Sequence, residues 1–144
     1  MAPEPYDERE IEGKDFIIRR VNPEQHVVPD EDTGRLRTSS KLFSPSSGPN
    51  GGMSVDLPRL IENNGIDPRE YVTTPVFTGS VCFTAGIVRN TGLRVGYDPI
   101  ADNPYHGEVW GPVERPNKFS RSQKRALANS AVWFVELPGV DIKI

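Results

Sequence analysis

Proline and glycine divide this chain into short pieces, which constrains its fold more than any other feature of the sequence. Fourteen prolines and thirteen glycines are spread over 144 residues. Proline interrupts helices and central strands, and glycine marks turns. The apolar runs between them are only a few residues long. The sequence therefore predicts short strands and short helices joined by loops.

Alternation of apolar and polar residues predicts five or six short strands. The strand segments are 16–21, 53–55, 79–85, 93–97, 106–110 and 132–137. Capping residues and prolines predict two or three helices. The helical segments are 57–64, 68–72 and 121–130. The connections are too short for a series of crossover helices, so we expect an α+β fold with a mostly antiparallel or mixed sheet.

The start of the chain differs from the rest. Residues 1–15 hold six acidic residues against Arg9 and Lys14, and they show no apolar periodicity. Residues 1–14 are therefore predicted to form an acidic, flexible tail. Residues 15–144 are long enough to bury a core and are expected to form a single domain. The serines, prolines and glycines of residues 44–52 predict a flexible surface loop within it.

Composition limits the class of protein. The single cysteine, Cys82, has no partner for an internal disulfide and favours a reducing setting. No apolar run approaches the roughly 20 residues of a membrane span, and the acidic N-terminus lacks the apolar core of a secretory signal. We therefore expect a cytoplasmic protein with no membrane partner. A net charge of −3 does not favour a strongly basic nucleic-acid-binding protein.

The stretch from Tyr97 to Trp110 concentrates more reactive side chains than any other part of the chain. On a strand, His106 and Glu108 share one face, because side chains alternate. A histidine beside a carboxylate can act as a general base. Asp98-Pro99 and Asn103-Pro104 are also typical turn formers, so a structural role is the alternative.

A histidine in that role needs a partner, and residues 37–41 are the candidate segment. Ser39 and Ser40 lie among basic residues and could hold a phosphate, with Arg20 contributing from the first strand. No nucleotide-binding glycine motif and no serine-nucleophile elbow is present. The histidines and the cysteine show no zinc-ligand spacing, so no metal and no cofactor are predicted.

A basic segment near the C-terminal end is a candidate binding surface. It contains Lys118, Arg121, Lys124 and Arg125. These charges could contact an acidic protein partner or a nucleic-acid backbone. The alternative is an exposed helix face that covers the sheet through apolar residues. A protein partner is favoured over nucleic acid, and no feature of the sequence indicates an oligomeric state.

The chain resembles a group of small, uncharacterised bacterial proteins. The resemblance covers most of residues 16–110. The loop at residues 44–52 is longer in this chain than in the group. It implies no activity, because none is known for the group. The shared pattern is Arg19-Arg20-Val21, Ser39-Ser40 with Phe43, Met53-Ser54-Val55-Asp56, and Asn103-Pro104-x-His106-x-x-Val109.

A second, fainter similarity is to ADP-ribosyltransferase-like folds. Those folds use an arginine on an early strand, a serine motif and a later glutamate. The similarity implies these roles for Arg19 or Arg20, for Ser39 and for Glu108. The Ser-Thr-Ser strand of those folds is not evident in this sequence. The similarity therefore serves as an analogy only.

Three functions follow as hypotheses. The leading one is a small cytoplasmic binding or accessory protein that works with a protein partner. The second is an enzyme acting on a nucleotide or phosphate-bearing substrate near Arg20, Ser39, Ser40, His106 and Glu108. The third is nucleic-acid contact through the basic helix at 118–125.

Overall fold

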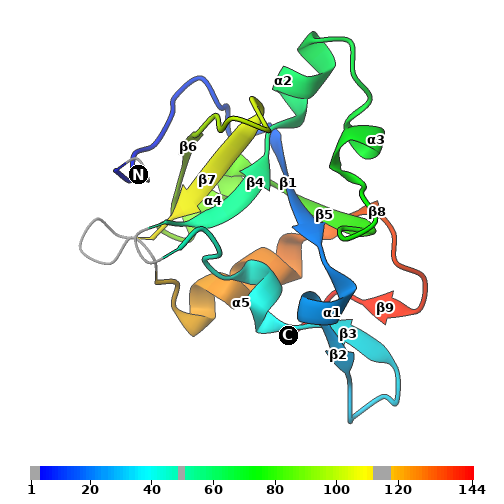
Figure 1. Cartoon of the computed structure of the whole chain (residues 1–144). Coiled ribbons are helices and arrows are strands. Elements are labelled where there is room, and N and C mark those ends of the chain that lie inside the picture. The colour runs from blue at the N-terminus through cyan, green and yellow to red at the C-terminus, as the bar shows by residue number, and fades with distance from the viewer. Residues whose placement is uncertain (1–3, 49–50, 112–117) are drawn as a thin grey trace.

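A six-stranded antiparallel sheet organises the computed structural model (Figure 1), which describes residues 4–48, 51–111 and 118–144. The order of its strands is β6-β7-β4-β1-β5-β8, and every neighbouring pair is antiparallel. In chain order the strands are β1 Phe16–Val21, β4 Met53–Asp56, β5 Gly79–Thr84, β6 Arg94–Tyr97, β7 His106–Trp110 and β8 Val132–Val135.

A second, smaller sheet lies beside the first. It contains β2 (Val27–Pro29), β3 (Leu36–Thr38) and β9 (Val140–Asp141), with β3 in the middle. The β2–β3 pair is antiparallel and the β3–β9 pair is parallel. Its position depends on contacts between distant segments, since the Thr38 hydroxyl donates to the Lys143 carbonyl at 2.9 Å.

Five short α-helices and one 3₁₀ helix are described. Pro23, Pro58 and Pro68 are the first residues of three of them, and Ser120 forms a full capping box with Gln123 before the longest helix. The helices are α1 Pro23–His26, η1 Ser40–Phe43, α2 Pro58–Asn63, α3 Pro68–Val72, α4 Ala85–Asn90 and α5 Arg121–Ser130. None of the described helices has the length and apolar character needed to cross a membrane.

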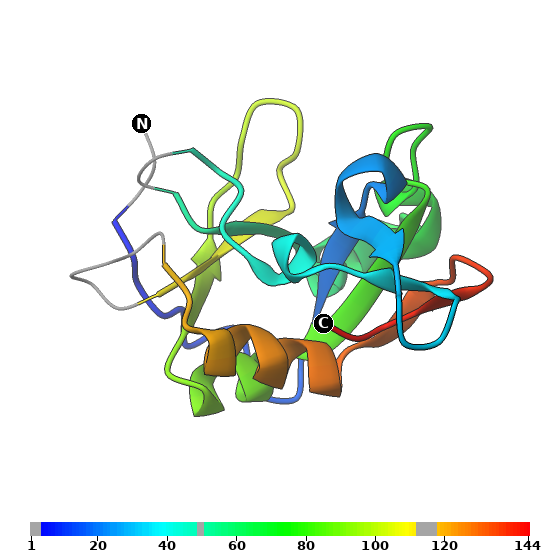
Figure 2. The ribbon, with the colours of Figure 1, turned by 90° about the horizontal axis from the view of Figure 1, so that it is seen from below.

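The two faces of the main sheet have different surroundings. One face packs on the larger core, where η1, α4 and α5 contribute Phe43, Val88 and Leu127. Figure 2 shows α4 and α5 together on this side. The other face carries a small apolar cluster that includes Ile18 and Cys82, beneath α2 and α3. This second face leaves room for polar side chains on the central strands.

The acidic N-terminal segment is docked over its described part. Tyr6 donates from its hydroxyl to the Tyr97 carbonyl at 2.7 Å, and its ring lies 5.4 Å from that of Trp110. Asp7 pairs with Arg89, and Ile11 is buried. The sequence predicts a flexible tail over 1–14 because its composition is acidic. Tyr6 and Ile11 provide the apolar contacts, while Asp7 and Glu8 position the segment on Val95 of β6 and Arg89 of α4.

The predicted α+β class and the mostly antiparallel sheet are confirmed. The structure adds elements in segments where the sequence predicts a loop or no defined element, including β3, η1 and α1. Each is three or four residues long and carries no periodic pattern of its own. Such elements depend on tertiary contacts, which local sequence does not reveal.

A buried arginine takes the place of part of the ladder between β1 and β4. The strands pair where Ile18 faces Asp56, and they diverge from there (Figure 1). The guanidinium of Arg19 donates from Nε to the Leu42 carbonyl at 2.8 Å and from Nη1 to the Ser54 carbonyl at 3.1 Å. Burial lowers the pKa of Arg19 to about 10, so the group stays charged at neutral pH, with Glu108 and Asp56 as the nearby negative charges.

Arg19→Met is expected to lower the free energy of unfolding by roughly 3 kcal/mol, because it leaves two buried carbonyls without their donor. Urea unfolding followed by tryptophan fluorescence measures the change. Arg9→Met, at an exposed position, is the matched control and should change the free energy of unfolding by less than about 0.5 kcal/mol. A loss below about 1 kcal/mol for Arg19→Met would show that these hydrogen bonds do not hold the sheet together.

Candidate functional site

Polar side chains of β4 and β7 meet on one face of the main sheet. The register places Ser54 opposite Glu108 and Asp56 opposite His106. Directly opposed residues of an antiparallel pair lie on the same face. The face shared by His106 and Glu108 is therefore also the face of Ser54, a residue that the sequence did not single out.

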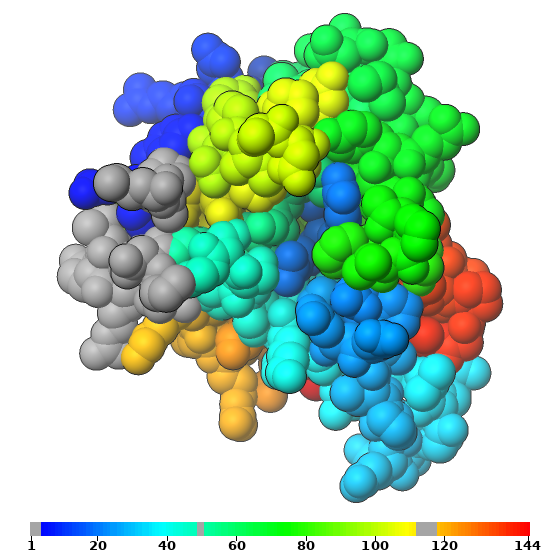
Figure 3. Space-filling model, in the orientation of Figure 1, coloured from blue at the N-terminus to red at the C-terminus, as the bar shows by residue number. Residues whose placement is uncertain are grey.

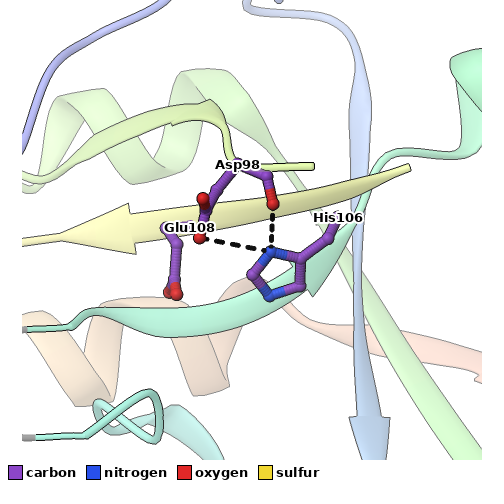
Figure 4. Close-up of side chains that lie close together, drawn as sticks. All are labelled: Asp98, His106 and Glu108. Carbon is purple, nitrogen blue, oxygen red and sulfur yellow. Dashed lines mark hydrogen bonds and ion pairs between the residues drawn. The ribbon is translucent and has the colours of Figure 1, made fainter. Parts of the chain in front are cut away.

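His106 is held between two oxygen atoms. Its Nδ1 lies 2.7 Å from the Asp98 backbone carbonyl and 3.5 Å from an Asp98 carboxylate oxygen (Figure 4). Its Nε2 lies 3.1 Å from Ser54 Oγ. A carbonyl only accepts hydrogen bonds, so Nδ1 carries the proton of the neutral ring and Nε2 has the free lone pair. The Ser54 hydroxyl then donates to Nε2, as a nucleophile donates to its base.

The loop after η1 supports Ser54 from the other side. Ser47 Oγ lies 2.7 Å from Ser54 Oγ, and the Ser54 amide donates to Ser46 Oγ at 3.2 Å. Gly52 brings this loop against β7, because a Cβ there would lie 2.2 Å from the Val109 carbonyl oxygen. The segment 44–52, predicted as a surface loop, contributes two serines to the site, and residues 49–50 lie outside the described part.

Glu108 is a buried carboxyl group with an unused oxygen. It is 2% exposed, and among the described residues its Oε2 has no hydrogen-bond partner. Burial raises the pKa of Glu108, and the nearby Asp98 acts in the same direction. A hydrogen bond from Ser47 and the charges of His106 and Arg19 oppose the rise in pKa. Ser47 has a single hydroxyl proton, so it can donate to Glu108 or to Ser54, 2.7 Å away, but not to both at once.

Asp98, His106 and Glu108 also form a cluster in which one donor atom of each lies within 4.8 Å of the others. Histidine and carboxylates are ligands of Zn²⁺ and related ions, at bond lengths near 2.0–2.2 Å. The proton on Nδ1 is committed to the Asp98 carbonyl, so Nε2 is the one ring nitrogen left for a metal, and it already accepts from Ser54 Oγ at 3.1 Å. The arrangement therefore fits a hydrogen-bonded histidine better than a metal centre.

A second polar network borders the site. Arg20 donates from Nε and Nη2 to the two carboxylate oxygens of Asp56, at 2.8 and 3.0 Å. Asn103 donates to the same carboxylate at 2.8 Å and accepts from the Tyr71 hydroxyl at 2.8 Å. The turn that contains Asn103 is thereby fixed to the sheet. Asn103-Pro104 has the predicted turn role and also takes part in the site.

These two networks open into one pocket of about 260 Å³. Figure 3 shows it as a hollow with β1, in blue, at its floor, between the yellow segment that follows β6 and the green segment before β5. The pocket is lined by Arg19, Arg20, Ser54, Val55, Asp56, Phe77, Ile100, Asp102, Asn103 and His106. Arg20 and His106, both predicted site residues, share this pocket.

The structure places the remaining predicted site residues elsewhere. Ser39 and Ser40 line a different hollow, of about 760 Å³, and His106 does not line it. The sequence predicts a partner for His106 within residues 37–41. In the structure the partner is Ser54. The proposed binding residues Arg121, Lys124 and Arg125 line a third hollow near α5. Lys118 is exposed just before that helix.

Glu108→Gln is expected to stabilise the protein increasingly as the pH rises. The folded state raises the Glu108 pKa above its ordinary 4.5, so wild-type stability falls as the pH increases through the raised pKa. A neutral glutamine removes that dependence, so the variant should gain on wild type between pH 4.5 and 8. Urea unfolding at several pH values measures the difference. Glu62→Gln, exposed, is the control, and an equal pH dependence in Glu108→Gln and wild type would contradict the assignment.

Comparison with known proteins gave no family. A scan against protein-family models, a search of curated proteins and a search of solved structures found no match to this chain. The resemblance to small bacterial proteins therefore stays a prediction.

Proposed function

We propose that this protein is a hydrolytic enzyme in which Ser54 is the nucleophile and His106 the general base. One observation carries the proposal. The Ser54 hydroxyl lies 3.1 Å from His106 Nε2, while the Asp98 carbonyl, 2.7 Å from Nδ1, sets the tautomer that makes Nε2 basic. Nucleophile, base and orienting group are thus in sequence, as acyl-transfer chemistry requires.

The reaction follows from this order. His106 Nε2 takes the Ser54 proton as Ser54 Oγ bonds to the substrate carbonyl carbon. The Asp98 carboxylate, 3.5 Å from Nδ1, favours the imidazolium that forms. His106 returns the proton to the leaving alcohol or amine, which leaves an ester on Ser54. Water, deprotonated by His106, then attacks this ester, and the carboxylic acid and free Ser54 are released.

The walls of the pocket favour an uncharged substrate. Arg19 and Arg20 are balanced by Asp56 and Asp102, so the formal charges of the lining cancel. Asp56 occupies Nε and Nη2 of Arg20, and Nη1 is the donor that we assign to the developing oxyanion. A carboxylic ester or amide therefore fits better than the phosphate-bearing substrate predicted from the sequence, because a phosphate dianion would lie beside two carboxylates.

The segments that resemble the bacterial group also support the pocket as the site. They are distant in sequence, and seven of their residues line it together. These are Arg19, Arg20, Ser54, Val55, Asp56, Asn103 and His106. The analogy with ADP-ribosyltransferase-like folds gains no such support, because Ser39 lines another hollow and Glu108 is fully buried.

Ser54→Ala is expected to reduce hydrolysis of p-nitrophenyl acetate and p-nitrophenyl butyrate by at least about 100-fold, and His106→Gln by a similar factor. A fluorophosphonate probe should label wild type at Ser54, as read by peptide mass spectrometry, and should not label Ser54→Ala. Ser40→Ala, at an exposed serine outside the pocket, is the control and should keep full activity. Labelling at another residue, or unchanged hydrolysis in folded Ser54→Ala, would refute the mechanism.

A binding role with an acidic partner is the second proposal. It corresponds to the cytoplasmic accessory protein predicted from the sequence, and the observation that favours it is the charge on α5. Arg121 and Arg125 are exposed, and neither pairs with an acidic side chain among the described residues. Partner capture that survives Ser54→Ala but is lost on neutralising these arginines would separate this role from catalysis.

A further inference from the structure

We infer that the hollow between α5 and η1 is a binding site for a single compact anion, such as the phosphoryl group of a small phosphate ester. This inference rests on the binding role proposed for α5 and is independent of Ser54. It follows from three features of the described residues: where the hollow lies, how its charges are arranged, and what limits their reach.

The hollow is formed by two segments that are far apart in sequence. The first is the start of η1, which supplies the hydroxyl of Ser40, and the second is the N-terminal half of α5, which supplies three cations. Figure 2 shows η1 lying next to α5. The volume is about 330 Å³, and the lining is Ser40, Arg121, Lys124, Arg125 and Ile144. One hydroxyl and three cationic groups around a small space can surround a phosphoryl group with donors.

The charges of this hollow oppose the stability of the helix that carries them. Arg121 is the first residue of α5, and the first turn contains no acidic residue. The N-terminal end of a helix is its positive end, so cations there are unfavourable. No ion pair with an acidic side chain offsets them within residues 4–48, 51–111 and 118–144. A bound anion would offset the unfavourable interaction between the three cations and the positive end of the helix. This supports an anion as the ligand of the hollow.

The neighbouring hollow limits the size of the anion. It shares Ser40 and Ile144 with the first one and is bordered by Asp30, Glu31 and Asp32. Lys143 pairs with Asp30, and of the remaining charged side chains Glu31 and Asp32 outnumber Arg37, so the lining has one more carboxylate than cation. A polynucleotide continuing from the cations would meet these carboxylates. The charge pattern therefore favours one compact anion over an extended polyanion.

The test uses the full chain and two probes, inorganic phosphate and inorganic pyrophosphate. Isothermal titration calorimetry should show saturable one-to-one binding to wild type. The double variant Arg121→Gln/Arg125→Gln should weaken it at least about tenfold, since it removes charge-assisted hydrogen bonds. Arg9→Gln/Lys14→Gln makes the same change in net charge at exposed sites and should bind like wild type.

A second readout separates loss of the site from loss of the fold. Without phosphate, the Arg121→Gln/Arg125→Gln variant should melt at the same or a higher temperature than wild type, because two cations leave the positive end of α5. Phosphate should then raise the melting temperature of wild type and not that of the variant.

Two results would overturn the inference. The first is equal, non-saturable binding of phosphate by wild type and both double variants. The second is tighter binding of a single-stranded 20-nucleotide DNA than of pyrophosphate, with a steep dependence on salt, which would mean an extended polyanion surface. In the first case the wider binding role of α5 would stand if an acidic partner still bound, so the two proposals fail separately.

Discussion

The buried guanidinium of Arg19 is the interaction on which the rest of the structure depends. β1 and β4 pair at Ile18 and Asp56 and then separate, and Arg19 connects what the ladder no longer joins. Its donors reach the Leu42 carbonyl in η1, Ser46 in the loop between η1 and β4, and the Ser54 carbonyl in β4. Because an arginine offers five donors in a fixed plane, one side chain positions three segments.

The opening that Arg19 bridges is also where the pocket forms. Beside the point where β1 and β4 separate, Arg20, Ser54 and His106 surround a recess whose floor is β1. The polar groups lie on strands rather than on mobile loops, so their relative positions are set by sheet register. This arrangement buries the carboxyl group of Glu108 away from water, and burial raises its pKa.

Local pattern in the sequence reveals one member of the Ser54–His106 pair. The alternation of side chains along 106–110 placed His106 and Glu108 on one face, and the register confirms it. The other member, Ser54, lies on a segment, Ser54-Val55-Asp56, that shows the same alternation. Nothing in a single strand says which other strand lies beside it, so the pairing of Ser54 with Glu108 was not available from local pattern. Ser39 and Ser40 are candidates because basic residues lie near them in the sequence. Nearness in sequence does not show that they lie near His106 in space.

The sequence by itself determined the class of the fold and the kinds of element in it. Frequent proline and glycine limit the length of each strand and helix, and alternation sets which side chains share a face; both are local effects. Only the tertiary structure decided which strands are neighbours, that the acidic N-terminal segment docks on β6, and that His106 meets Ser54. These outcomes depend on packing and hydrogen bonds between residues as far apart as Ser54 and His106, and such contacts leave no periodic trace in the chain.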